Sequence, residues 1–226
     1  MSDLADRLTA VDAAIADAAR NAGRDPAALT RIVVTKFHPA SLVRELAELG
    51  VREVGENRHQ EAAAKAAQLA DLGLRWNFVG QLQRNKARAV RGYAASVHSL
   101  DRRELADALD RAGEGMPPLE VFIELNLTDD PSRGGVNPGD IEPLAAHVQT
   151  LPGLALRGVM AVAPLGAEPR AAFARVRAAS ERLRTTAPDA TAISAGMSGD
   201  FRAAILEGAT HLRIGTAITG KRSTPG

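Results

Sequence analysis

The sequence predicts an α/β protein built as a closed (β/α)8 barrel, the TIM barrel, with one extra helix before the first strand. Eight short apolar segments alternate with segments of helical periodicity. The connections are short, so the strands are expected to be parallel, and eight such units in 226 residues match the size of this barrel. An open doubly wound sheet is the alternative. It would use fewer strands, and no Gly-x-Gly-x-x-Gly follows the first one.

The expected elements follow one another regularly. Apolar residues at helical spacing predict a helix over residues 2–22. Strands are expected at residues 31–37, 51–54, 76–79, 95–97, 119–125, 156–162, 190–194 and 211–214. Helices are expected at 39–50, after 57 to about 72, at 83–91, at 168–184 and at 200–207. A further helix is expected to start at a capping pattern at 99–104, and another, after the loop at 126–139, to end near 150. No composition shift marks a linker, so residues 1–226 are expected to form a single domain.

Composition narrows the function classes. The 28 basic and 27 acidic side chains are interspersed and only 3% of residues are aromatic, which argues against a nucleic-acid partner. The absence of cysteine excludes disulfides and thiolate catalysis. The N-terminus is polar and carries acids, unlike a signal or transit peptide, and no apolar run has membrane-spanning length. We therefore expect a cytoplasmic protein with no membrane partner. A monomer is also expected.

The first strand ends at a lysine. Ile32, Val33 and Val34 form a continuous apolar run typical of a strand buried on both faces, and Lys36 follows it. Burial against such a strand would disfavour the ammonium form and free the amine to attack a carbonyl compound as a Schiff-base nucleophile. The alternative is a lysine whose side chain extends from the strand end into solvent.

Two loops near the C-terminus predict a phosphate site. After strand seven, Gly196, Ser198 and Gly199 precede a helix, where exposed amides favour an anion. After strand eight the chain continues as Arg213-Ile-Gly-Thr-Ala-Ile-Thr-Gly220. Loops seven and eight of this barrel commonly bind phosphate. The alternative is that Ser198 only caps a helix and the glycines only form turns.

All loops that follow the strands lie on one rim of a barrel, so Lys36, Asn57 and Gln81 are expected to meet the two phosphate loops there. The five histidines show no metal-ligand spacing, so no metal site is expected. A Schiff-base lysine beside a phosphate site fits either a sugar phosphate, as in a lysine aldolase, or pyridoxal phosphate. Arg213 favours pyridoxal phosphate, because its guanidinium could donate to the pyridine nitrogen and keep it unprotonated.

The chain resembles the pyridoxal phosphate homeostasis proteins, which are relatives of the N-terminal barrel of alanine racemase. The matching segments, at 34–39, 55–57, 76–86, 98–101, 158–162, 196–201 and 211–220, run in order from the first strand to the last. Two positions depart from the usual pattern. Ala195 stands where a bulky apolar residue is usual, and Arg133 where a lysine is usual.

The resemblance implies a set of cofactor-binding residues. Lys36 would hold pyridoxal phosphate as a Schiff base, with Asn57 beside the ring and Arg213 facing the pyridine nitrogen. Ser198, Gly215 and Thr216 would bind the phosphate, and Gly199 belongs to the same loop.

The resemblance also implies a carrier or regulator of intracellular vitamin B6 and amino-acid pools, with apo-enzymes as recipients of the cofactor. A weak amino-acid racemase is the alternative. Alanine racemase uses a tyrosine from a separate domain as its second base, whereas the one tyrosine here, Tyr93, is expected at a helix end before strand four.

Overall fold

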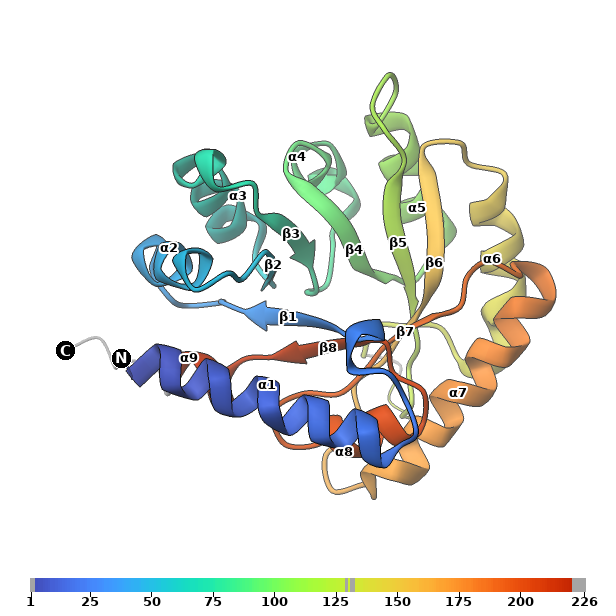
Figure 1. The fold of residues 1–226 in the computed structure, drawn as a ribbon. Coiled ribbons are helices and arrows are strands. Elements are labelled where there is room, and N and C mark those ends of the chain that lie inside the picture. The colour runs from blue at the N-terminus through green and yellow to red at the C-terminus, as the bar shows by residue number, and fades with distance from the viewer. Residues whose placement is uncertain (1–2, 129, 131–132, 221–226) are drawn as a thin grey trace.

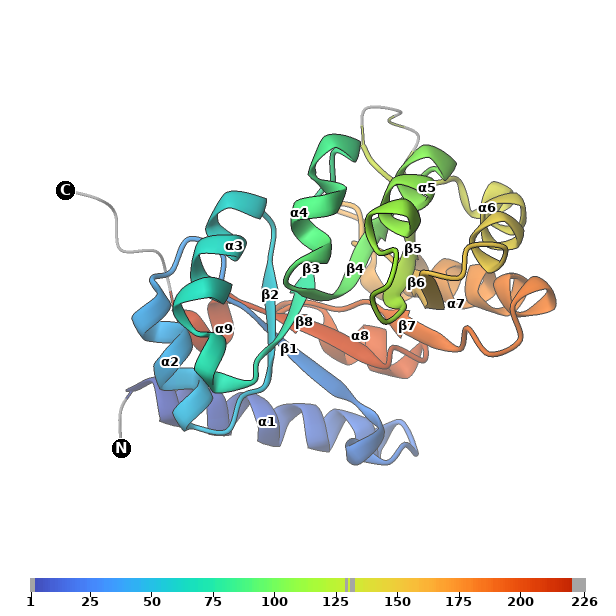
Figure 2. The same cartoon turned by 90° about the horizontal axis from the view of Figure 1, so that it is seen from above.

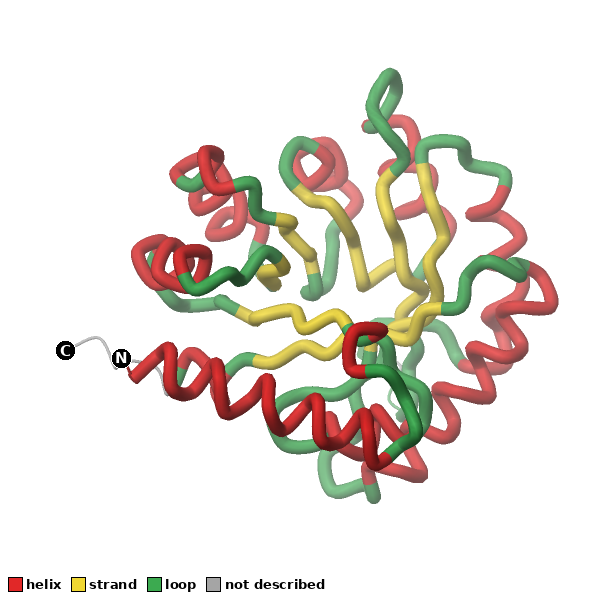
Figure 3. The backbone as a smooth tube through the Cα atoms, in the orientation of Figure 1, coloured by secondary structure: helices red, strands yellow, loops and turns green. Residues whose placement is uncertain are grey.

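The computed structural model describes residues 3–128, 130 and 133–220. Eight parallel strands form a closed barrel in which neighbours follow chain order and the eighth strand pairs with the first. The predicted TIM barrel is therefore confirmed. Figure 1 shows the strands at the centre with helices around them, and Figure 3 separates the two by colour. In Figure 2 helices α2 to α6 follow one another around one side of the strands.

The strands agree closely with the apolar segments of the sequence. They are β1 Thr30–Val34, β2 Glu53–Glu56, β3 Arg75–Phe78, β4 Ala94–Leu100, β5 Leu119–Glu124, β6 Leu154–Met160, β7 Ala192–Ser194 and β8 His211–Ile214. Ile32 and Val33 on β1 are both fully buried. Because neighbouring strand residues point to opposite faces, β1 has apolar contacts on the barrel interior and on the helix layer.

The helices cover the outside of the strands. They are α1 Asp3–Asn21, α2 Ala40–Glu48, α3 His59–Gln68, α4 Ala87–Arg91, α5 Arg103–Ala112, α6 Ile141–Gln149, α7 Pro169–Thr186, α8 Phe201–Leu206 and α9 Thr216–Thr219. Short 3-10 turns lie at Pro26–Ala28, Ala70–Leu72, Arg84–Lys86 and Pro138–Asp140. The extra N-terminal helix α1 is present as predicted and packs on α8 and α9. None of the described helices is both long enough and apolar enough to cross a membrane.

Two details of the expected elements are wrong. The helix expected at the capping pattern 99–104 does begin inside it, at Arg103, but β4 continues to Leu100 and the N-cap residue Arg102 makes no side-chain hydrogen bond to α5. His98, Ser99 and Leu100 are all buried, so the polar residues that suggested a strand end belong to the strand. A short helix, α9, also follows β8 where only a loop was expected.

Candidate cofactor site

One cavity of about 470 Å³ opens at the carboxyl-terminal rim of the barrel. Its wall includes every residue that was predicted from the sequence to bind the cofactor, namely Lys36, Asn57, Ser198, Gly199, Arg213, Gly215 and Thr216. These residues follow or end β1, β2, β7 and β8. The closed barrel brings them together, because the loops after parallel strands share one end.

Lys36 stands two residues beyond β1, in a tight turn. The amide of His38 donates to the carbonyl oxygen of Thr35 at 3.1 Å, and Phe37 has a φ of 67°. Such a backbone conformation is costly for a residue other than glycine and is typical of functional sites. Lys36 itself is exposed at the cavity, which agrees with the alternative that its side chain extends from the strand end into solvent and not with burial against the strand. The amine is accessible to a carbonyl compound without any rearrangement.

A buried ion pair holds the backbone just before Lys36. Lys65 on α3 donates through Nζ to Glu56 Oε1 at 2.6 Å and to the carbonyl oxygen of Thr35 at 3.0 Å. The Thr35 hydroxyl donates to the same carboxylate oxygen at 2.7 Å. Glu56 is 1% and Lys65 is 7% exposed. This pair was not predicted from the sequence, although a lysine next to Ala62 and Ala66 on the buried side of α3 was a usable signal.

The two loops at the far side of the cavity offer hydrogen-bond donors for an anion. Ser198 Oγ accepts from the amide of Ala217 at 3.3 Å, which joins the loop after β7 to α9. Within the described residues, the backbone amides of Ser198, Gly199, Gly215 and Thr216 have no protein acceptor. Four amides without acceptors in one cavity wall suit a phosphate group.

Arg213 supplies a buried positive charge to the cavity and is only 5% exposed. Its Nη1 donates to the carbonyl oxygen of Ser194 at 2.7 Å and to Ser194 Oγ at 2.6 Å, and Nη2 donates to the carbonyl oxygen of Ala161 at 2.7 Å. Burial lowers the pKa of Arg213 to about 10, against the opposing effect of the Glu124 and Asp200 carboxylates. The guanidinium therefore stays charged at neutral pH.

Asn57 leaves a polar atom without a partner. Its Oδ1 is buried and has no hydrogen-bond donor within the described residues, although Asn57 lines the cavity. Buried polar atoms are normally satisfied, so an unmatched acceptor in a cavity wall indicates a place for a ligand's donor. The residues of this cavity thus fit a ligand with a carbonyl, a phosphate and a hydrogen-bonding ring.

Gln81 reaches the same rim but does not join this cavity. It lines a neighbouring cavity of about 360 Å³, together with Glu124 and Arg133, and donates through Nε2 to Glu124 Oε2 at 2.9 Å. Burial, and then the nearby Asp101 carboxylate, raise the pKa of Glu124 to about 7. Val162 belongs to the walls of both cavities, so the two adjoin.

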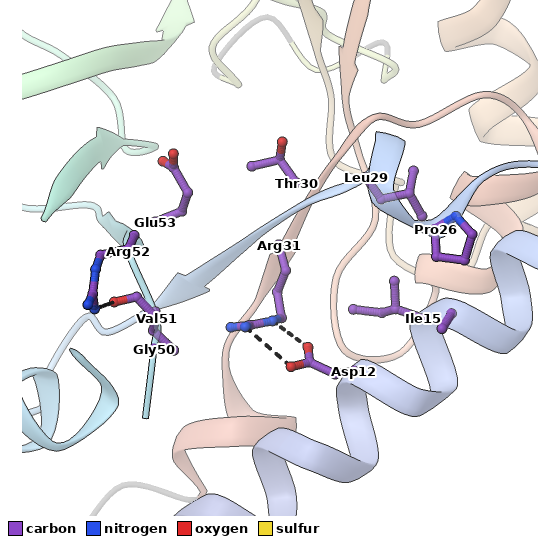
Figure 4. A pocket seen from close by; sticks show the side chains of 11 residues that line it. Asp12, Ile15, Pro26, Leu29, Thr30, Arg31, Gly50, Val51, Arg52 and Glu53 are labelled. Carbon is purple, nitrogen blue, oxygen red and sulfur yellow. Dashed lines mark hydrogen bonds and ion pairs between the residues drawn. The ribbon is translucent and has the colours of Figure 1, made fainter. Parts of the chain in front are cut away.

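A third cavity, of about 480 Å³, lies at the amino-terminal side of β1 and β2 (Figure 4). Arg31 and Asp12 face each other in its wall, with 2.5 Å between Nε and Oδ1, and Glu53 also lines it. It contains none of the predicted site residues. Among the described residues, no group of three or more acidic, histidine or cysteine side chains could hold a metal ion.

The barrel and its rim place the chain in a known class of protein. The family model for the N-terminal domain of alanine racemase matches residues 8–223. Alanine racemase from Corynebacterium glutamicum has the same fold, with a TM-score of 0.69, 17% identity and coverage of 97% of this chain and 62% of that chain.

Closer relatives define the family within this class. The pyridoxal phosphate homeostasis protein of Pseudomonas aeruginosa is 44% identical, over 98% of this chain and 97% of its own length. The protein of the same name from Escherichia coli K12 is 39% identical, over 98% of each chain. PipY of Synechococcus elongatus, solved with pyridoxal phosphate bound, has a TM-score of 0.84 and 36% identity, over 96% of this chain and 100% of that chain. The chain belongs to the pyridoxal phosphate homeostasis protein family.

Proposed function

We propose that this chain binds pyridoxal phosphate as a Schiff base on Lys36 and serves intracellular vitamin B6 and amino-acid homeostasis. The observation that carries the proposal is the single cavity that contains Lys36, four amides without acceptors and the buried Arg213. The cofactor found in PipY supports the same ligand. Apo-enzymes are the proposed recipients of the cofactor, and a cytoplasmic monomer is the proposed state.

Each end of the cavity has a separate role. Bound pyridoxal phosphate supplies an electrophilic carbon and a ring that can accept electron density. Lys36 provides the amine, which is exposed and held in a tight turn. The amides of Ser198, Gly199, Gly215 and Thr216 bind the phosphate, and Asn57 lies beside the ring.

Arg213 favours a carrier over an efficient enzyme. As a permanent donor it would hold the ring nitrogen unprotonated, which weakens the ring as an acceptor of electrons. Tyr93 does not line the cavity, its hydroxyl is buried, and burial together with the Glu56 charge raises its pKa. It cannot act as the second base that racemisation requires. A weak racemase is the second candidate, and loss of optical activity from an added L-amino acid tests it.

The proposal is tested by the absorption spectrum of the purified protein, followed by borohydride reduction and peptide mapping. Wild-type protein is expected to show a cofactor band and to carry the reduced label on Lys36. Lys36→Ala is expected to lose the band and the label, because no other amine of the described residues lines the cavity. The control Lys86→Ala, in the turn before α4, is expected to retain both. Label on any other lysine would refute the assignment.

A further inference from the structure

A line of hydrogen-bonded polar side chains crosses the inside of the barrel from the cofactor cavity to the opposite end. We call it the interior chain. In order from the cavity, its members are Arg213, Ser194, His98, Ser96, Asn77 and Glu53, from β8, β7, β4, β3 and β2. All but Glu53 are buried. Glu53 lines the cavity of Figure 4, and its Oε1 also accepts from Arg75 Nε on β3 at 2.8 Å.

The contacts of the interior chain are short and continuous. Arg213 Nη1 lies 2.6 Å from Ser194 Oγ, which lies 2.9 Å from His98 Nδ1. His98 Nε2 lies 2.9 Å from Ser96 Oγ. Ser96 Oγ lies 2.6 Å from Asn77 Oδ1, and Asn77 Nδ2 lies 2.8 Å from Glu53 Oε2. Phe122 stacks on the His98 ring with 4.2 Å between centroids, so the imidazole is fixed from one face as well.

Donor and acceptor chemistry gives the interior chain a direction. An arginine only donates, so Ser194 Oγ accepts from Arg213, and among the described residues the acceptor left for its own hydrogen is His98 Nδ1. From the other end, a carboxylate only accepts, so Asn77 donates to Glu53 and presents Oδ1 to the hydroxyl of Ser96. Ser96 Oγ must then accept from His98 Nε2.

Both ends therefore require the same form of His98: a neutral imidazole with its hydrogen on Nε2. Burial, followed by the charge of Arg213, lowers the pKa of His98, in agreement with a neutral ring. A second hydrogen on Nδ1 would leave the Ser194 hydroxyl without an acceptor, in a site where unsatisfied polar groups are costly.

The interior chain also limits how Arg213 can turn. Nη1 makes two hydrogen bonds, both to Ser194, and Nη2 makes one, to Ala161. Within the described residues, the remaining Nε and Nη2 hydrogens of Arg213 have no acceptor, so they are available to a ligand in the cavity that Arg213 lines.

We propose that His98 is a positioning residue: its neutral Nε2–H form orients the Ser194 hydroxyl and, through it, the guanidinium of Arg213 toward the ring of the cofactor. The assignment rests on the proposed function above. His98 does not line the cavity, so its effect reaches the cofactor only through Ser194 and Arg213.

Nitrogen NMR of the His98 ring in the purified wild-type protein tests the direction of the interior chain. We expect one nitrogen, Nε2, with the shift and coupled proton of a protonated ring nitrogen and the other, Nδ1, with the shift of an unprotonated one. Hydrogen on Nδ1, or on both nitrogens, would overturn the proposal.

A matched pair of variants tests the link to the cofactor. Ser96→Ala removes the acceptor for His98 Nε2–H, whereas Ser99→Ala, on the same strand, removes a buried hydroxyl that has no partner within the described residues. For Ser96→Ala we expect a mixed population of His98 forms, a displaced cofactor absorption band and about three- to tenfold faster cofactor loss. Ser99→Ala is expected to match wild type in all three measurements.

His98→Gln provides a rescue test, because an amide offers an acceptor and a donor at nearly the spacing of the two ring nitrogens. We expect His98→Gln to retain the wild-type absorption band, and His98→Leu to lose it.

Identical spectra for Ser96→Ala and Ser99→Ala would overturn the proposal. Wild-type protein with no cofactor band refutes the proposed function instead, whereas a wrong tautomer in protein that holds the cofactor refutes only the role of His98.

Discussion

Lys65 shows how a residue outside the cavity can set the position of one inside it. Its Nζ binds the carbonyl oxygen of Thr35, whose peptide bond leads directly to Lys36. The same ammonium neutralises Glu56, which has almost no contact with solvent. A buried pair of this kind adds little net stability over apolar residues, but breaking it is costly because one charge is left without a partner.

Lys65→Met is therefore expected to lower the free energy of unfolding by about 3–5 kcal/mol, measured by denaturant titration. Adding Glu56→Gln removes the stranded charge and is expected to recover at least half of that loss. Lys86→Met, in the turn before α4, serves as the control and should change stability by less than about 0.5 kcal/mol. A double variant no more stable than Lys65→Met would contradict the buried-charge explanation.

The residues of the cavity could be predicted from the sequence where the neighbouring residues alone indicated their role. Lys36 follows an apolar strand, and Ser198 and Gly215 lie in glycine-containing loops after strands. The role of His98 could not be predicted, because its partner Ser194 lies 96 residues away in the chain. Lys65 was visible as a lysine on the apolar side of a helix, but its contact with Thr35, 30 residues away, was not. Their roles depend on barrel closure and helix packing.

At the scale of elements, the rim is built by close approach of neighbouring loops. Gly80, just after β3, lies against the backbone beyond β2: a Cβ placed there would be 2.2 Å from the carbonyl oxygen of Asn57. Gly80 and Asn57 both line the cofactor cavity. The absence of a side chain at Gly80 thus lets the two loops form one wall.

Gly80→Ala is expected to push the Asn57 backbone away, to cost about 1–3 kcal/mol in stability and to speed cofactor loss, measured by unfolding and by dialysis followed by absorbance. Gly139→Ala is the matched control, since a Cβ there meets nothing within 4 Å and its φ is not in the left-handed region. If both variants retain the cofactor equally well, the close approach at Gly80 has no role in binding.

Strands made of a continuous apolar run were predictable from the sequence. Strands that contain polar residues were not. β1 and β5 agree with their apolar runs to within a few residues. β4 was expected to end three residues early, because His98 and Ser99 are polar although both are buried. The buried His98 ring is satisfied by a hydrogen bond to Ser194 on the distant strand β7, and that information is absent from a local window.

For the whole molecule, buried ionisable groups determine how stability depends on pH. Burial lowers the pKa of His98, and it lowers that of His211 to about 4. The unfolded chain therefore binds more protons than the folded one as pH falls below about 6.5, and stability is lost there. Glu124 acts in the opposite direction. Its pKa is raised to about 7, so its ionisation reduces stability as pH rises from about 4.5 to 7.

The lowered pKa values of the two histidines outweigh the raised pKa of the one carboxyl group. The free energy of unfolding is therefore expected to fall as the pH drops from about 6.5 to about 4. Glu124→Gln removes the opposing contribution. The variant is expected to be about 1–2 kcal/mol more stable than wild type at pH 8 and to lose stability more steeply on acidification. Denaturant titrations from pH 8 to pH 4 measure both effects. A variant less stable than wild type at pH 8 would contradict the assigned cost of ionising Glu124.

The pairing of β1 with β8 has a consequence for how the protein is made. Lys36 emerges early from the ribosome, whereas Arg213, Gly215 and Thr216 are synthesised some 180 residues later, and Arg7 Nε on α1 binds the carbonyl oxygen of Ile218 at 2.7 Å. A nascent polypeptide therefore presents the amine long before it presents the anion pocket. Stable capture of the vitamin has to wait until translation has passed the closing strand.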